Sequence, residues 1–155
     1  MKTYLHQVWL LLMCVLLFAG LLMPVGEFAN PEGATASLTN FRINFIEGDS
    51  VSAMWALAVV LIVSLLVSFF ELLLSGFRNF TLQKRILIFN ALLLVGYYVI
   101  FVVYVLCAAD GATFRPMWGG LMPLIALILD GITFFSVQRA EAMIIAGADS
   151  FRLRD

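Results

Sequence analysis

Charged side chains are scarce in this sequence: Asp, Glu, Lys and Arg together make up 12 % of its 155 residues, against about a quarter in a soluble domain. The formal net charge of −1 excludes a nucleic-acid-binding protein, whose binding face is strongly basic. One histidine and two cysteines are too few for a Cys/His zinc site or a disulfide framework. Apolar residues are plentiful instead, at 63 %. The composition therefore predicts an integral membrane protein, and the length allows a single domain over residues 1–155.

Four apolar stretches are long enough to cross a bilayer, whose hydrocarbon core takes about 20 helical residues. They cover approximately residues 4–23, 51–74, 86–109 and 117–137. The first stretch follows Lys2, as a signal peptide does, but its apolar run is longer than a usual signal core, so we expect a retained helix. None of the stretches alternates with the period of a barrel strand. The pattern predicts an all-α integral membrane fold, a bundle of four transmembrane helices.

Basic residues between the spans predict the orientation, because they concentrate on the cytoplasmic side. One side holds Lys2, Arg78, Lys84, Arg85, Arg139, Arg152 and Arg154, and the other side holds only Arg42 and Arg115. We therefore expect both termini and the tail at 138–155 in the cytoplasm. Four of these residues are predicted to anchor the bundle at the cytoplasmic surface: Arg78, Lys84, Arg85 and Arg139.

The first outer loop contains a signal for β-structure. Residues 41–45 alternate apolar and polar side chains, which is typical of a short strand. The segment Asn30-Pro31-Glu32-Gly33 is typical of a turn. We therefore expect a short β-hairpin over the outer end of the bundle.

Three polar residues stand out within the apolar spans: Glu71, Asn90 and Asp130. At 1.5 Å per helical residue, they lie roughly 8 to 11 Å from the inner ends of their spans, so they share one level. His6 and Gln7 lie near the same surface. Because intramembrane charges are costly, three interpretations arise. In the first, Glu71 reaches toward Arg78, and Asp130 is neutral or hydrogen-bonded to Asn90 or a tyrosine hydroxyl. In the second, Glu71 and Asp130 share a proton or cation. In the third, one of the two acids pairs with an Arg or Lys of another subunit.

The remaining motifs point to helix packing and not to a reaction. Ser64 and Ser68 form a small-xxx-small pair that lets helices approach closely, so we expect them to serve helix packing. The sequence has no nucleophile–base pair, metal-ligand cluster, phosphate-binding loop or cofactor motif. We therefore expect a protein that is not an enzyme, with no catalytic residue, no metal and no cofactor.

Three segments carry a resemblance to a known family. They are Gln7, Trp9 and Leu10-Leu11-Leu12; then Phe77-Arg78-Asn79 with Leu82-Gln83-Lys84-Arg85, Ile86 and Asn90; and finally Leu121 to Leu127 followed by Arg139, Glu141, Asp149, Arg152 and Leu153-Arg154. Through them the whole chain resembles the four-helix inner-membrane family of Bacteroidota catalogued as domain of unknown function 4293. The resemblance implies a bacterial inner-membrane location and the same topology, and it implies no reaction.

The chain departs from that family's pattern at a few positions. Phe80 stands where the family usually has Arg, Ala140 stands where it has Asp, and residues 144–147 lack the Arg of the family's tail. These differences make the tail less polar and weaken the expectation that it binds a charged partner.

Two functions remain from the sequence. A small soluble portion and unpaired intramembrane acids favour an accessory or scaffolding subunit of a larger envelope membrane complex, whose partners are membrane lipids and other inner-membrane subunits rather than nucleic acid. The alternative is a homo-oligomeric transporter or channel for protons, small cations or a lipid-like solute that uses Glu71 and Asp130.

Overall fold

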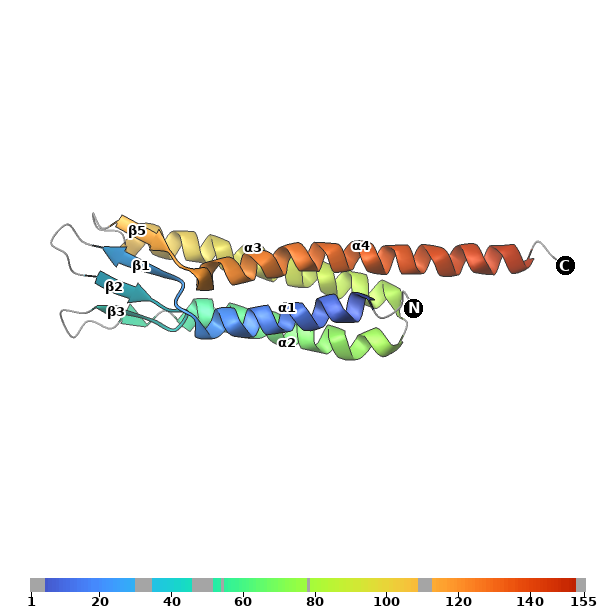
Figure 1. The fold of residues 1–155 in the computed structure, drawn as a ribbon, viewed down its shortest axis with the longest axis horizontal. Coiled ribbons are helices and arrows are strands. Elements are labelled where there is room, and N and C mark those ends of the chain that lie inside the picture. Colours follow the sequence, from blue (N-terminus) through green and yellow to red (C-terminus); the bar gives the residue numbers. More distant parts are fainter. Residues whose placement is uncertain are drawn as a thin grey trace.

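A computed structural model of the chain describes residues 5–29, 35–45, 52–53, 55–77, 79–108 and 113–152. Four helices dominate it: α1 (Leu5–Leu22), α2 (Trp55–Leu74), α3 (Phe80–Ala108) and α4 (Trp118–Arg152). A short 3-10 turn, η1 (Ser75–Phe77), follows α2. The predicted four-helix architecture is confirmed (Figure 1). Three helical stretches are long and apolar enough to span a membrane, namely Trp55–Phe77, Phe80–Cys107 and Trp118–Ala146, and α1 contributes a shorter apolar helix.

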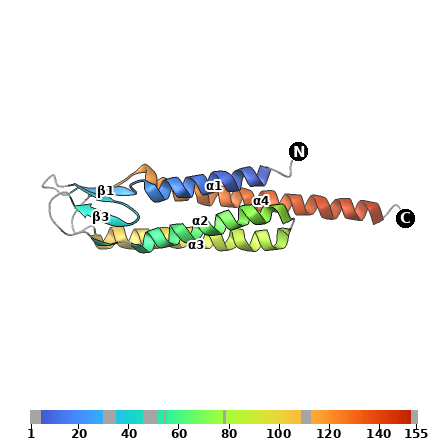
Figure 2. The ribbon, with the colours of Figure 1, turned by 90° about the horizontal axis from the view of Figure 1, so that it is seen from below.

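The helices form a ring in which consecutive helices are neighbours. α1 packs on α2, α2 on α3, α3 on α4, and α4 closes the ring against α1. Each helix runs antiparallel to its two neighbours (Figures 1 and 2). Outward-facing residues on every helix are apolar and more than half exposed, among them Val15, Leu66, Val99 and Ile128. Helices that are hydrophobic on their outer as well as their inner face are suited to a hydrocarbon surrounding.

A small antiparallel sheet covers one end of the bundle. Its strands are β1 (Gly26–Ala29), β2 (Thr35–Leu38), β3 (Arg42–Phe45), β4 (Ser52–Ala53) and β5 (Thr113–Pro116), in the order β4-β3-β2-β1-β5. The hairpin expected in the first loop is confirmed, with β3 over the alternating residues. The turn expected at 30–33 lies outside the described residues. β5 was not expected: it comes from the connection between α3 and α4 and pairs with β1.

The sheet is attached to the bundle by its own small core. Val25, Phe28, Ala36, Leu38 and Ile43 are buried and pack against Phe101, Tyr104, Val105 and Phe114. The rings of Phe28 and Phe114, opposite each other on β1 and β5, have centroids 5.2 Å apart. We call this end of the molecule the sheet end, and the opposite end, where α1 begins and η1 turns, the terminal end.

At the terminal end two helices differ from the predicted spans. α3 begins at Phe80, six residues before the predicted span, because Asn79 caps it: the Asn79 Oδ1 accepts the Leu82 N–H at 3.3 Å. α4 is one helix of 35 residues, roughly 52 Å long, and projects beyond the other helices (Figure 1). Lys84 and Glu141 form an ion pair that ties α3 to this projecting part.

Candidate functional site

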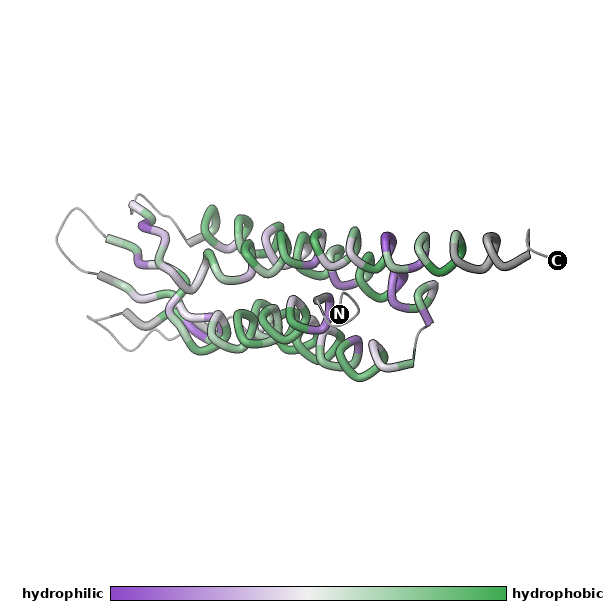
Figure 3. The backbone as a smooth tube through the Cα atoms, turned by 45° about the vertical axis from the view of Figure 1, so that its right-hand side comes forward, coloured by the Kyte–Doolittle hydropathy of each residue, from purple (hydrophilic) through white to green (hydrophobic). Residues whose placement is uncertain are grey.

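The inward face of α2 changes character along its length. Its buried residues recur at every third or fourth position, which places them on one side of the helix: Leu57, Ala58, Leu61, Ser64, Ser68 and Glu71. The first three, toward the sheet end, are apolar, and the last three, toward the terminal end, are polar. Figure 3 shows the helices as mainly hydrophobic, with hydrophilic positions near the terminal end and in the strands. The polar positions of α2 therefore form the start of a site.

Asn90 on α3 joins three helices through its side-chain amide. Its Nδ2 donates to Asp130 Oδ1 on α4 at 3.1 Å and to Ser68 Oγ on α2 at 3.2 Å. Its Oδ1 accepts the Ser64 hydroxyl at 2.7 Å. All four residues are 2 % exposed or less. The structure thus brings Asn90 and Asp130 together, and it places the two serines, expected to serve only helix packing, in the same hydrogen-bonded network.

Met13 extends this network to α1. Its sulfur lies 3.9 Å from Asn90 Nδ2 and is buried in the bundle. A thioether is a weak acceptor, so this contact adds little energy. It shows that Asn90 lies at the centre of the ring, where all four helices meet. We refer to Ser64, Ser68, Glu71, Asn90 and Asp130 as the polar cluster.

Glu71 is the member of the polar cluster that has no hydrogen bond. It lies on α2 one turn beyond Ser68, its side chain is fully buried, and neither carboxylate oxygen has a partner among the described residues. Asn90 joins Ser68, one turn before Glu71, to Asp130, so the two carboxyl groups border the same network. Burying an unpartnered charge is expensive, so a carboxyl group in such a place is stable only with a proton or a cation on it.

Further polar side chains lead from the polar cluster to the terminal end. Gln7 Nε2 donates to Ser75 Oγ at 3.1 Å, and Gln83 Nε2 donates to the Leu74 carbonyl at 3.3 Å. His6 is also buried here, and its Nε2, like the Gln83 Oε1, has no partner among the described residues. Sequence reasoning missed Ser75 and Gln83. Their spacing contains the signal, because they lie four residues after Glu71 and seven before Asn90, on the same helix faces.

The predicted basic anchors lie away from the polar cluster. Lys84 pairs with Glu141 at the surface, while Arg85 and Arg139 are exposed near the terminal end. Arg78 lies outside the described residues. The cluster therefore combines two carboxyl groups with hydroxyl and amide groups, and no described lysine or arginine enters it.

The atoms of the polar cluster that could bind a cation are mainly oxygen atoms. Carboxylate, hydroxyl and amide oxygens suit a proton or a hard cation, whereas soft metals prefer sulfur. Within the described ranges, no three His, Cys, Asp or Glu side chains are grouped in a way that could hold a metal ion. The polar cluster therefore suits a proton or another hard cation better than a soft metal.

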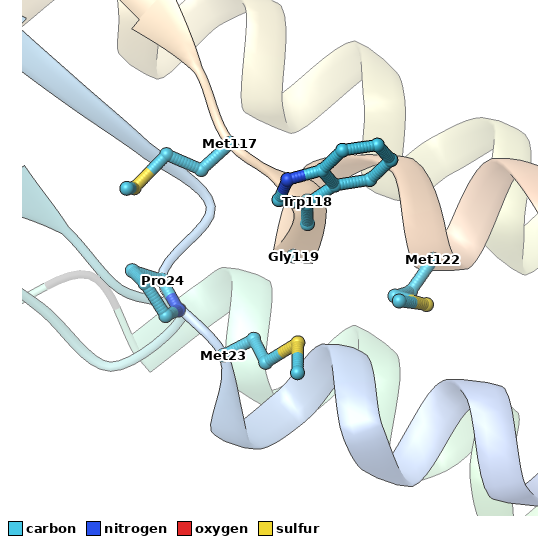
Figure 4. A pocket seen from close by; sticks show the side chains of 6 residues that line it. All are labelled: Met23, Pro24, Met117, Trp118, Gly119 and Met122. Carbon is cyan, nitrogen blue, oxygen red and sulfur yellow. The ribbon is translucent and has the colours of Figure 1, made fainter.

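A separate pocket at the sheet end has different chemistry. It has a volume of about 310 Å³ and is lined by Met23, Pro24, Met117, Trp118, Gly119 and Met122. Figure 4 shows the Trp118 ring on one side, with Met23 and Met122 on the other and the Met117 side chain directed toward the strands. None of these residues is ionisable. The pocket is a joint between the end of α1 and the start of α4 rather than a site for charge.

Two comparisons with known proteins bear on this chain. A search of curated proteins finds no match for the sequence. A family model, described as Domain of unknown function (DUF4293), matches residues 6–148 and so spans the four helices and the sheet. The resemblance noted in the sequence is thereby confirmed, and the chain belongs to the DUF4293 family.

Proposed function

We propose that this protein binds a cation, either a proton or a small metal cation, between Glu71 and Asp130 and moves it across a membrane. One observation carries the proposal: Glu71 is fully buried within the bundle, and neither of its oxygen atoms has a described hydrogen-bond partner. A carboxyl group kept only for stability would be hydrogen-bonded, because an unsatisfied buried polar group costs about 1 to 3 kcal/mol. A bound, exchangeable cation would interact with the two Glu71 oxygen atoms that have no hydrogen-bond partner among the described residues.

The surrounding residues suggest a direction of entry. Polar side chains continue from the polar cluster through Ser75 and Gln83 to the terminal end, whereas Leu17, Leu61 and Leu94 fill the bundle toward the sheet end. A cation would therefore reach Glu71 from the terminal end. With the orientation expected from the loop charges, this end faces the cytoplasm of a bacterial cell and the membrane is the inner membrane.

Transport also requires a second access route. Four short helices rarely enclose an aqueous pathway alone, and the sheet half of this bundle is filled by apolar side chains. We therefore propose that the transporting form is a homo-oligomer. Chemical cross-linking in native membranes, followed by gel electrophoresis, should show a dimer or larger species.

The decisive experiment is cation flux into proteoliposomes that contain the purified protein. A pH gradient, and in parallel a Na⁺ gradient, is imposed, and internal cation concentration is followed with a fluorescent dye. We expect flux in the wild type and its loss in Glu71→Gln and Asp130→Asn. Glu141→Gln is the matched control, because it removes an acid at the protein surface and should keep the wild-type rate. Equal flux in Glu71→Gln and the wild type would refute the proposal.

An accessory or scaffolding subunit remains the second candidate, and a different observation favours it. On the projecting part of α4, Met143, Ile144 and Ile145 are 50 to 59 % exposed. A partner subunit could cover this surface. Glu71 faces the interior of its own bundle, so it does not supply the contact. Extraction in a mild detergent followed by mass spectrometry should recover a stoichiometric partner if this candidate is correct.

A further inference from the structure

A groove runs between α3 and α4 on the apolar outer surface of the bundle. Its volume is about 310 Å³, and the residues that matter here are Leu87, Ala91, Asp130, Gly131, Phe134 and Phe135. Phe135 at its edge is 63 % exposed, so the groove opens to the surroundings of the bundle. The two helices belong to the stretches that are apolar enough to span a membrane. The groove therefore faces lipid, at the level of the polar cluster.

Small residues keep this groove open. A side-chain carbon added to Gly131 would meet no atom within 4 Å, and Ala91 faces it from α3. The groove thus depends on two positions where the side chain is missing or short. A volume near 310 Å³ is at the lower end of the range of small-molecule sites, about 300 to 1,000 Å³.

The lining combines one carboxyl group with aromatic rings. Asp130 is the only ionisable residue among the described residues that line the groove, and Asn90 donates to one of its oxygen atoms from inside the bundle. The rings of Phe134 and Phe135 have centroids 6.0 Å apart, and both border the groove. A carboxylate beside aromatic faces is the chemistry that recognises an ammonium group. The remaining aliphatic lining suits an apolar chain.

We propose that this groove binds a lipophilic ammonium ion, which enters sideways from the bilayer and places its head group on Asp130. This inference rests on the proposed function, because the ammonium ion takes the place of the cation bound between Asp130 and Glu71. The chemical class follows from charge complementarity: no described lysine or arginine lines the groove or enters the polar cluster. Binding of the ammonium ion and release of the smaller, singly charged cation leave the net charge of the site unchanged, so the two would exchange.

The test uses a probe that reports its own position. The protein is reconstituted in nanodiscs and labelled with a dodecylammonium ion that carries a photoreactive diazirine. Labelled peptides are identified by mass spectrometry. Three competitors share the same chain and differ in charge: dodecylamine, dodecanol and dodecanoate. We expect labelling at residues 87–91 and 127–135, competition by dodecylamine, and no competition by the neutral or anionic compound.

Variants separate recognition from simple partitioning into lipid. We expect labelling to fall about tenfold in Asp130→Asn, which corresponds to about 1.4 kcal/mol, and to vanish in Gly131→Leu, which fills the groove. Gly96→Leu is the matched control, because Gly96 on α3 also has no atom within 4 Å of an added side-chain carbon and lies outside the groove. Phe135→Leu, at an exposed position, leaves packing intact and should reduce labelling about threefold through loss of a cation–π contact.

Two outcomes would overturn the inference: dodecanol competing as well as dodecylamine, or labelling unchanged in Asp130→Asn and Phe135→Leu. The same variants distinguish this failure from failure of the proposed function. If Glu71→Gln abolishes cation flux but labelling does not depend on Asp130, the proposed ammonium site in the groove is refuted and the proposed function stands. If labelling depends on Asp130 but Glu71→Gln keeps full cation flux, the proposed function is refuted and the ammonium site stands.

Discussion

The two halves of the bundle interior differ in how completely their buried polar atoms are hydrogen-bonded. In the sheet half, Tyr97 donates to Asn40 Oδ1 at 2.8 Å, and Asn40 Nδ2 donates to the Gly20 carbonyl at 2.8 Å. Both side chains are fully buried and hydrogen-bonded. In the terminal half, both oxygen atoms of Glu71, the Nε2 of His6 and the Oε1 of Gln83 have no partner among the described residues.

The unpartnered atoms of Glu71 stand out within the terminal half as well, because the neighbouring Asn90 is hydrogen-bonded to Ser68 and Asp130. Nearly all buried polar atoms in folded proteins are hydrogen-bonded, so exceptions need an explanation. The satisfied groups in the sheet half join α1, α3 and the loop before β3, where the sheet meets the bundle. The unsatisfied groups lie in the terminal half. Under the proposed function, the cation therefore binds in the half of the bundle opposite to Tyr97 and Asn40.

The largest effect on stability is expected from Gly119→Ala in the sheet half. A side-chain carbon at Gly119 would lie 2.3 Å from the Pro24 carbonyl oxygen, so the ends of α1 and α4 would have to separate. We expect a loss of about 3 kcal/mol or more in the free energy of unfolding, measured by titration with a denaturing detergent in mixed micelles. Gly131→Ala on the same helix is the control and should stay within about 1 kcal/mol of the wild type. Equal losses in the free energy of unfolding for Gly119→Ala and Gly131→Ala would show that the two sites do not differ in packing.

Asn90→Leu tests whether the polar cluster also contributes to stability. The change removes three hydrogen bonds at once and leaves the Asp130 carboxyl without its amide partner. We expect a loss of about 2 kcal/mol in the same unfolding measurement. The double variant Asn90→Leu with Asp130→Leu should recover part of the loss, because no unpaired carboxyl group remains. If Asn90→Leu leaves the free energy of unfolding unchanged, the hydrogen bonds of Asn90 make no net contribution to stability.

Glu71→Leu should shift stability in the opposite direction. Replacing a buried carboxyl group that lacks partners with an apolar side chain of similar size should raise the free energy of unfolding by about 1 to 2 kcal/mol, while cation flux is lost. Asn40→Leu provides the comparison from the sheet half and should lower stability, since Asn40 is fully hydrogen-bonded. A destabilised Glu71→Leu would indicate that Glu71 serves the fold.

Tyr97→Phe is expected to have the smallest of these effects. It removes one hydroxyl group and its bond to Asn40, while the ring keeps its packing near Tyr98 and Phe101. We expect a loss of about 1 kcal/mol, visible as a lower thermal transition followed by circular dichroism, and unchanged cation flux. A drop in flux would mean that the sheet half takes part in transport.

The helices and the level of the polar residues could be predicted because a bilayer imposes a common frame. A span needs about 20 apolar residues, and a fixed rise per residue converts distance along the sequence into depth. Glu71, Asn90 and Asp130 were therefore expected at one level. The rise alone does not say which way a side chain faces, so the bond between Asn90 and Asp130 was one of several expected for Asp130, and the isolation of Glu71 could not be derived.

β5 shows a second limit. Its four residues include a proline, and two helices, α2 and α3, separate it in the sequence from its partner β1, whose Phe28 pairs with Phe114. Nothing local in such a short segment specifies a strand. It pairs with β1 because the end of α3 and the start of α4 bring it beside a strand edge that still has free backbone groups.

Apolar run lengths determined by themselves that this chain forms four apolar helices, three of them long enough to span a membrane, because transfer from water to hydrocarbon depends on composition over a whole segment. Packing decided the rest. Only the closed ring of four helices places the amide of Asn90 against Asp130, leaves Glu71 without a partner and opens a groove beside Gly131. These features depend on side-chain direction and on small gaps between helices, which a pattern along one chain does not encode.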